Sequence, residues 1–192
     1  MKKWIYMGVF MGLFTSNAFA EDIRLPEPDK TGKTTLMQAL EDRHSDREID
    51  EKTLSSILWA AYGVNRDDGK RTIPTAMDKK DLNIYVFKKD GIWLYDADNN
   101  LLKQQSGQNQ MALFQMQDYM TTVPVVLVYT GSTEDYAAMH AGSSYQNVEL
   151  YAAANGMASI VRDFYDREKV PEVLKLPKGQ RVIITQAIGW KN

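Results

Sequence analysis

Apolar residues recur along this chain with two different spacings, which predict helices in some segments and strands in others. Positions 54–61 carry apolar side chains at the helical period, with Asp50 placed to cap the start of a helix and Gly63 placed to end it. Two further helices are expected, one over Thr34–Asp42 and a short one over Ala112–Tyr119.

Four segments have the pattern of strands. Leu82–Phe87 alternates apolar and polar residues, and Ile92–Tyr95 follows it across a Lys89-Asp90-Gly91 turn, so the two predict a hairpin. Val123–Tyr129 is nearly all apolar and β-branched, which predicts a central strand buried on both faces. Arg181–Ile188 is expected to be the last strand.

A long helix is predicted from Ser143 to Phe164, because apolar side chains recur through it at helical spacing and its opposite side is also rather apolar. Such a helix belongs in the middle of a domain. The mixture of helices and strands indicates an α+β sandwich, and no repeat or linker marks a second domain.

The first twenty residues have the pattern of a secretory signal peptide. Two lysines precede the eleven-residue apolar run Trp4–Phe14, and Ala18-Phe19-Ala20 has the form of a cleavage site. A membrane anchor would need roughly 20 apolar residues. We therefore expect residues 1–20 to be a signal peptide and residues 21–192 to form one periplasmic or secreted domain, which begins with an extended arm over Glu21–Lys30.

The composition excludes several classes of protein. The chain has 192 residues, of which 44% are hydrophobic and none is cysteine, so disorder, a disulfide scaffold and thiolate chemistry are excluded. Loss of Lys2 and Lys3 with the signal peptide changes the net charge from −2 to −4. This balance argues against a nucleic acid or an anionic membrane as partner.

Several short motifs lack the context that their chemistry requires. The segment Thr31–Thr35 resembles the end of a phosphate-binding loop, but Glu27 stands where that loop needs a glycine. The two histidines, His44 and His140, are far apart and lie in no metal-binding pattern, so no metal is expected. Ser143 and its neighbour lack the glycines of a hydrolase nucleophile turn.

The segment Arg43-His44-Ser45-Asp46-Arg47 lies between two predicted helices. In an extended connector, Arg43, Ser45 and Arg47 face the same side, and two guanidinium groups with one hydroxyl suit a phosphate group. On spacing alone, a salt-bridged turn with the neighbouring carboxylates is the simpler interpretation. Likewise, Arg71–Ala76 either brings its backbone close to a flat ligand or is an ordinary polar loop.

The order and spacing of several segments resemble the nitroreductase family of flavin enzymes, in the branch often called SagB-type dehydrogenases. Arg43-x-Ser45-x-Arg47 resembles the R-x-S-x-R motif of the family. The other similar segments are, in chain order, Leu54–Gly63, Arg71–Ala76, Leu82–Phe87, Gly91–Asp96, Ala141–Met157 and Ile188–Lys191. Together they span nearly the whole mature chain, and this joint order is what supports the resemblance.

The resemblance implies a three-layer α/β/α sandwich, with a mostly antiparallel sheet around a central long helix, that forms a homodimer and binds FMN. It implies that the phosphate is held by Arg43, Ser45, Arg47 and Lys191 (the phosphate clamp), and that the flavin ring is lined by Pro74, Thr75 and Ala76. It names no catalytic acid.

Residues after Ala76 depart from the family pattern. Met77 stands where the family usually has glycine, and Asp78 where many members have an asparagine near the flavin ring. A carboxylate there would disfavour a reduced, anionic flavin. Gln146 and Asn147, expected to open the long helix, either favour reduced flavin through the helix dipole or make helix-end hydrogen bonds.

The expected function is therefore that of an exported FMN-dependent oxidoreductase, which transfers hydride to an unknown small-molecule or peptide substrate. The usual donor of the family, NAD(P)H, is not freely available outside the cytoplasm. The alternative is a non-catalytic ligand- or flavin-binding module on the nitroreductase fold.

Overall fold

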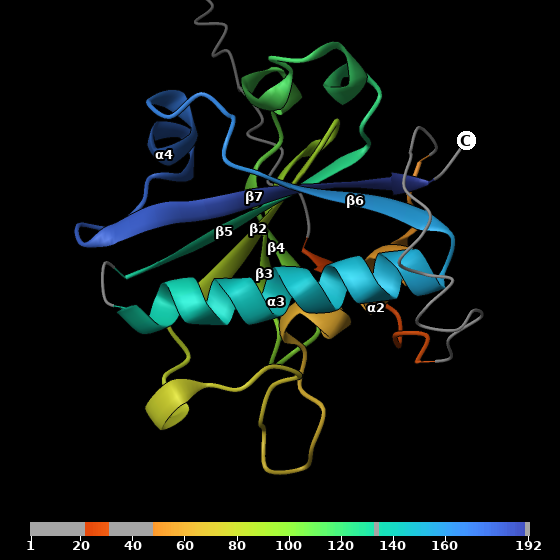
Figure 1. The fold of residues 1–192 in the computed structure, drawn as a ribbon, viewed down its shortest axis with the longest axis vertical. Helices are drawn as coiled ribbons and strands as arrows, with labels where there is room; N and C mark the ends of the chain where they lie inside the picture. The colour runs from red at the N-terminus through yellow and green to blue at the C-terminus, as the bar shows by residue number, and fades with distance from the viewer. Residues whose placement is uncertain (1–21, 31–47, 133–134, 191–192) are drawn as a thin grey trace, which may run out of the picture.

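The structure, a computed structural model, describes residues 22–30, 48–132 and 135–190. Its centre is a seven-stranded sheet in which every described pair of neighbours is antiparallel (Figure 1). In spatial order the strands are β1 (Ile23–Arg24), β4 (Leu101–Ser106), β3 (Gly91–Asp96), β2 (Leu82–Lys88), β5 (Val125–Ser132), β7 (Gln180–Trp190) and β6 (Met157–Arg162).

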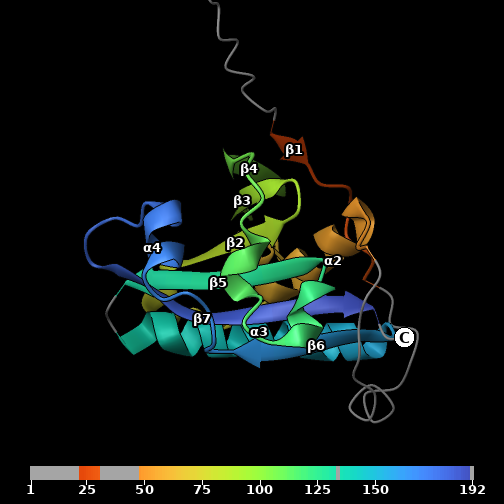
Figure 2. The same cartoon turned by 90° about the horizontal axis from the view of Figure 1, so that it is seen from above.

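Helices cover both faces of this sheet. On one face lie α2 (Glu51–Tyr62) and the long helix α3 (Asp135–Ala154). The opposite face carries α4 (Lys169–Leu174) and the 3-10 turns Met111–Phe114 and Asp118–Thr121 (Figures 1 and 2). The three layers and the antiparallel sheet agree with the predicted sandwich.

Two apolar cores lie on the two sides of the sheet. Leu58 of α2 and Leu127 of β5 belong to the core beneath the long helices. The neighbouring Val126 points to the other core, where the rings of Phe87 and Phe114 meet edge to face at 4.9 Å. Strand β5 is therefore buried on both faces, as its apolar sequence predicts, and each such large side chain contributes roughly 1.5–3 kcal/mol through its burial.

Helix α2 has the predicted boundaries. Asp50 accepts the backbone N–H of Thr53 at 2.7 Å, which satisfies a donor that the first helical turn leaves open. Gly63 ends the helix, and a Cβ there would lie only 2.4 Å from the Trp59 ring. A glycine is thus required at this position by the close approach of the tryptophan.

The predicted hairpin is also confirmed. Strands β2 and β3 pair with Lys88 opposite Gly91, so Lys89 and Asp90 form the turn. Gly91 has a φ of +143°, a backbone angle that residues with a side chain rarely adopt, and a Cβ there would clash with the Ser106 carbonyl. The last strand, predicted over 181–188, is confirmed and extends to Trp190.

The predicted long helix over Ser143–Phe164 is wrong in its placement. Helix α3 begins eight residues earlier and ends at Ala154, and Gly156 then takes the left-handed φ of +70°. Residues 157–162 form the edge strand β6, with Ile160 opposite Ala187. A short apolar run fits both periods, and here backbone pairing with β7 decides for the strand.

Three further elements differ from the sequence-based prediction or were not predicted. The short helix expected over Ala112–Tyr119 is replaced by the two 3-10 turns, separated at residues 115–117. Strand β4 and helix α4 had no recognised sequence signal. The extended arm is present at residues 22–30, where its strand β1 pairs with β4 and Leu25 is buried.

The proposed signal peptide, residues 1–20, and the helix expected over Thr34–Asp42 lie outside the described residues. Within the described part, no helix has the length and apolar character needed to cross a membrane.

Candidate functional site

The structure describes one of the two groups of predicted flavin ligands. Pro74, Thr75 and Ala76 lie in the described loop between α2 and β2. The four clamp residues Arg43, Ser45, Arg47 and Lys191 lie outside the described residues, so the clamp stays a prediction.

The chain neighbours of the clamp are joined by a hydrogen bond. The indole N–H of Trp190, next to Lys191, donates to the backbone carbonyl of Glu48, next to Arg47, at 2.9 Å. The two described segments that lead into the clamp therefore meet at the end of β7.

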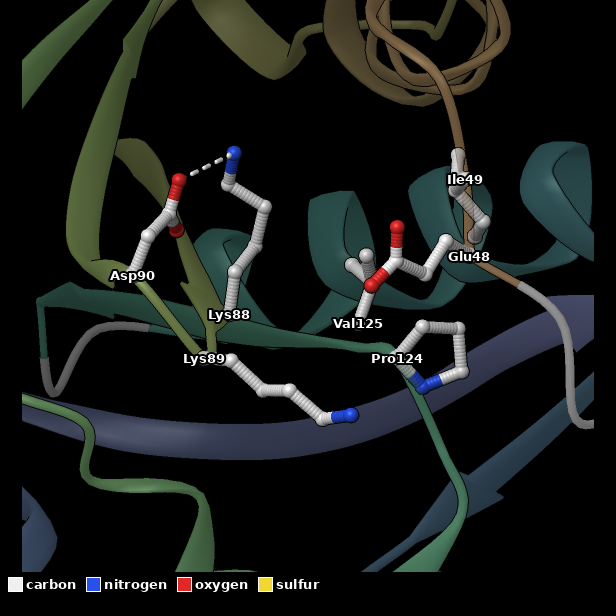
Figure 3. A pocket seen from close by; sticks show the side chains of 7 residues that line it. All are labelled: Glu48, Ile49, Lys88, Lys89, Asp90, Pro124 and Val125. Atoms are coloured by element: carbon white, nitrogen blue, oxygen red, sulfur yellow. Dashed lines mark ion pairs between the residues drawn. The ribbon is translucent and has the colours of Figure 1, made fainter.

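A pocket of about 210 Å³ opens beside this junction (Figure 3). It lies between the segment before α2, the β2–β3 hairpin and the start of β5, and is lined by Glu48, Ile49, Lys88, Lys89, Asp90, Pro124 and Val125. Lys88 contacts Asp90 at 3.1 Å and lies 5.5 Å above the Trp93 ring. Two ammonium and two carboxylate groups thus border the pocket, which gives it no strong net charge.

The loop of residues 71–78 leaves α2 and is first attached to the end of that helix. The Thr72 N–H donates to the Gly63 carbonyl at 2.9 Å, and its hydroxyl donates to the Ala60 carbonyl at 3.0 Å. Ile73 is buried, whereas Pro74 is exposed. The residues expected to line a flavin therefore follow a firmly attached first half of the loop.

Arg71, at the start of this loop, is a buried cation. Its Nη1 lies 2.9 Å from Asp98 Oδ1, and its guanidinium lies 5.0 Å from the centre of the Tyr62 ring. Burial raises the pKa of Tyr62, and the nearby guanidinium opposes that rise. The arginine thus connects the loop to the β3–β4 turn.

Met77 and Asp78 have left-handed backbone angles, with φ of 54° and 56°. The Met77 side chain is 79% exposed. Glycine, usual for the family at this position, adopts such angles without strain, whereas methionine does not. The backbone geometry therefore explains why glycine suits this position, and here a methionine takes the same conformation.

One face of α3 carries three polar side chains at positions i, i+4 and i+7: His140, Ser144 and Asn147. Ser144 donates to the Ala61 carbonyl at 2.7 Å. Asn147 donates to the carbonyls of Ala60 at 3.1 Å and of Thr72 at 3.4 Å.

His140 completes this face, because its Nε2 accepts the backbone N–H of Ala76 at 2.8 Å. Its Nδ1 lies 2.7 Å from Oδ1 of Asp81. Since Nε2 accepts, the proton is on Nδ1 and is donated to the carboxylate, so the imidazole is neutral. The ring is buried and stacks on Tyr136, with centroids 6.5 Å apart. No ring nitrogen is left to exchange a proton with a substrate.

Gln146 and Asn147 do not open a helix, so the expected dipole role is wrong. Gln146 lies eleven residues after the start of α3 at Asp135, about 16 Å along its axis. It is exposed, while Asn147 faces the loop. The correction follows from the start of α3 at Asp135. Once His140 is known to lie in this helix, the spacing of His140, Ser144 and Asn147 indicates that their side chains share one face.

The clamp neighbours and the flavin loop lie at opposite ends of α2. Glu48 precedes this 12-residue helix and the loop follows it, which separates them by about 18 Å along the helix. In Figure 1 the turn Ala76–Asp78 lies under the N-terminal half of α3, whereas β7 points toward the side of its C-terminal half.

The three-layer fold with its antiparallel sheet agrees with the fold that the resemblance implies, and comparison with known proteins specifies the family. The family model described as "Nitroreductase family" matches residues 43–190. The chain therefore belongs to the nitroreductase family, whose members are generally flavin-dependent oxidoreductases.

Individual relatives agree with this assignment. A nitroreductase homologue from Methanocaldococcus jannaschii is 29% identical over 182 residues, covering 81% of this chain and 90% of that protein. The crystal structure of a nitroreductase homologue from Ralstonia eutropha has a TM-score of 0.78 at 30% identity, with 89% of this chain and 90% of that chain covered. The E. coli microcin synthetase McbBCD complex contains a chain of the same fold, with a TM-score of 0.65 at 17% identity, covering all of this chain and 79% of that chain.

Metal-ligating residues do not gather in the described part of the chain. Across residues 22–30, 48–132 and 135–190, no group of three or more His, Cys, Asp or Glu side chains is placed to hold an ion.

Proposed function

We propose that residues 21–192 form an exported, FMN-dependent oxidoreductase of the nitroreductase type, which transfers hydride to a small molecule or a peptide. Arg43, Ser45, Arg47 and Lys191 hold the FMN phosphate, and Pro74, Thr75 and Ala76 line the flavin ring. Bound FMN supplies the two-electron chemistry, while the protein binds and orients it.

The observation that carries this proposal is the hydrogen bond between Trp190 and Glu48. Glu48 and Trp190 are the described residues that adjoin Arg47 and Lys191 in the sequence, and the bond brings them into contact. The bond therefore supports convergence of Arg47 and Lys191, which are 144 positions apart in the sequence. Two cationic groups that converge in this way would suit a phosphate.

The described residues fit part of a flavin site. The pocket beside Glu48 has a volume of about 210 Å³. Small-molecule sites usually span roughly 300–1,000 Å³. The pocket can thus enclose only part of FMN, and the rest of the wall has to come from other surfaces.

A second copy of the chain is the simplest source of that wall. Glu48, the described neighbour of the clamp, and the loop of the same chain are separated by the length of α2, about 18 Å. In a symmetric dimer, the clamp of one copy and the loop of its partner can face the same ligand. We therefore propose a homodimer with flavin bound at the interface.

A non-catalytic binding module is the second candidate, and one observation favours it. The Met77 side chain extends into solvent directly after the flavin loop, and the carboxylate of Asp78 is also exposed. A bulky side chain and a negative charge at this position would hinder substrate approach and disfavour a reduced flavin.

The first experiment is an absorption spectrum of the purified mature protein, residues 21–192, before and after addition of FMN. Flavin bands that survive desalting and are released by denaturation are expected. Arg43→Ala and Arg47→Ala should lose the bands, whereas Arg66→Ala, at an exposed arginine in the loop after α2, should keep them. Full flavin content in both clamp variants would overturn the assignment, and flavin binding without reduction by any donor would favour the binding module.

Mixing two variants tests the shared site. Arg47→Ala removes the clamp and Thr75→Trp blocks the loop, so neither should bind FMN alone. When the two variants mix at random, half of the dimers contain one copy of each. Each of these mixed dimers has one intact site out of two, so about a quarter of the wild-type FMN-binding capacity should return. Recovery of none, or a flavin-loaded monomer by light scattering, would contradict the dimer site.

A further inference from the structure

Resting on the proposed flavin function, we propose that His140, held by Asp81, is the positioning residue of the flavin-lining loop. It fixes Ala76 through the backbone N–H, and thereby leaves the Thr75 hydroxyl, and not the Ala76 amide, for the flavin.

The contact is built from three separate elements. His140 comes from α3, Ala76 from the loop 64 positions earlier, and Asp81 from the residue before β2. His140 is fully buried, and its two nitrogens lie 2.8 Å from the Ala76 nitrogen and 2.7 Å from the Asp81 carboxylate. A side chain with both ends committed in this way can hold the loop but cannot act as an acid or base.

The Asp81 carboxylate selects the form of the imidazole that can do this. It accepts the Nδ1 proton, which leaves the Nε2 lone pair directed at Ala76. The other carboxylate oxygen, Oδ2, is buried and has no hydrogen-bond partner among the residues that the structure describes. A buried, half-satisfied carboxylate is costly, so the imidazole contact is the interaction that compensates for placing Asp81 here.

The bond to Ala76 lies where the loop most needs a constraint. Thr72 is attached to α2 and Pro74 has its φ fixed by its ring, but Met77 and Asp78 then adopt strained left-handed angles. Ala76 is the residue between the fixed half and the strained half. Holding its N–H keeps the left-handed turn from relaxing and moving the flavin-lining residues.

The same bond decides which loop donor remains for a ligand. The Ala76 N–H points to α3 and is already used. The Thr75 side chain is partly exposed, and within the described residues its hydroxyl makes no hydrogen bond. The loop thus keeps the Thr75 hydroxyl available to the flavin, whereas the Ala76 amide is not.

Two substitutions separate the two ends of the imidazole. In His140→Gln, the side-chain oxygen reaches the position of Nε2, so the acceptor for Ala76 is kept. In His140→Asn, the shorter amide reaches only the position of Nδ1, so the contact with Asp81 is kept and that with Ala76 is lost. Ser144→Ala is the matched control, because it removes a bond from the same helix face to Ala61 instead of the loop.

Two measurements are made on each variant: amide hydrogen exchange at Ala76 by NMR without flavin, and the dissociation constant for FMN by fluorescence titration. We expect Ala76 exchange to rise at least about tenfold and FMN binding to weaken about tenfold in His140→Asn. In His140→Gln and Ser144→Ala, both should stay within about threefold of the wild type.

Equal values for the Asn and Gln variants in both measurements would overturn the positioning role of His140 while leaving the flavin function intact. Absence of FMN binding by the wild-type protein would instead overturn the flavin function and this role with it, even where Ala76 exchange responds as expected. If the wild-type protein binds FMN but His140→Asn behaves like His140→Gln, only the role of His140 is contradicted.

Discussion

The indole N–H of Trp190 donates to the backbone carbonyl of Glu48 at 2.9 Å, joining two segments 142 positions apart in the sequence. One segment leads out of the predicted R-x-S-x-R motif and the other leads to the C-terminal lysine. The bond thus joins the two described residues that adjoin the parts of the chain that the resemblance to flavin enzymes implicates in phosphate binding.

Replacing Trp190 with Phe should weaken FMN binding about five- to tenfold, because one hydrogen bond that aligns the clamp segments is worth about 1 kcal/mol. The measurement is a fluorescence titration with FMN on the mature protein. Trp59→Phe is the control, since it removes a similar bond from an indole N–H to the Val64 carbonyl, at the other end of α2. Equal weakening in the two variants would show that the effect is not specific to the clamp.

Asn147 and its neighbour Gln146 should differ sharply in their effect on stability. Asn147→Ala loses bonds to the carbonyls of Ala60 and Thr72 and should lower the free energy of unfolding by about 1 kcal/mol, after the better helix propensity of alanine is included. Gln146→Ala should change it by less than about 0.5 kcal/mol, because Gln146 is exposed. Urea unfolding measures both, and a larger loss for Gln146→Ala would contradict the orientation of α3.

Buried tyrosines should make the fold unstable at alkaline pH. Burial raises the pKa of Tyr129 well above its ordinary value of 10.0, and its hydroxyl donates to Gln186 at 2.5 Å. A group whose pKa is raised by folding contributes stability that is complete below its unfolded pKa and declines as the pH rises above it. Stability should therefore fall above about pH 10, by up to about 1.4 kcal/mol per pH unit for each such tyrosine.

Tyr129→Phe isolates one of these groups. It should cost about 1–2 kcal/mol at neutral pH, because the Gln186 oxygen loses its donor. Between pH 10 and 11, the free energy of unfolding of this variant should decline less steeply than that of the wild type. The difference in slope should be up to about 1.4 kcal/mol per pH unit, the contribution of one buried tyrosine. Urea unfolding over this range measures the slopes, and parallel curves for the two proteins would contradict the buried phenol.

Two glycines, one inside α3 and one just after it, should respond in opposite directions to alanine. Gly142 lies inside the helix, where a Cβ would make only ordinary contacts with Tyr145 at 3.8 Å, so Gly142→Ala should stabilise by about 0.5–1 kcal/mol. Gly156 has φ +70° in open space, so Gly156→Ala should destabilise by about 1 kcal/mol through backbone strain alone. Thermal or urea unfolding checks the signs, and stabilisation by Gly156→Ala would mean that the helix continues as the sequence suggested.

The sequence was sufficient to predict those elements whose boundaries are set by residues close together in the chain. The cap at Asp50 and the stop at Gly63 set α2, and alternation with a glycine turn set the β2–β3 hairpin. By contrast, residues 157–162 are apolar at spacings that suit a helix, and they form a strand because β7 offers unpaired backbone groups beside them. The misplaced helix then also misplaced Gln146 and Asn147.

The sequence by itself determined the class of fold, the two groups of candidate flavin ligands and the resemblance to nitroreductases, because these depend on residue types at fixed spacing. Only the tertiary structure decided that α3 starts early enough to direct His140 at Ala76, that Trp190 meets Glu48, and that Glu48 and the loop of residues 71–78 lie at opposite ends of α2. Contacts between residues 64 or 142 positions apart arise from the packing of the sheet and helices, and no local pattern encodes them.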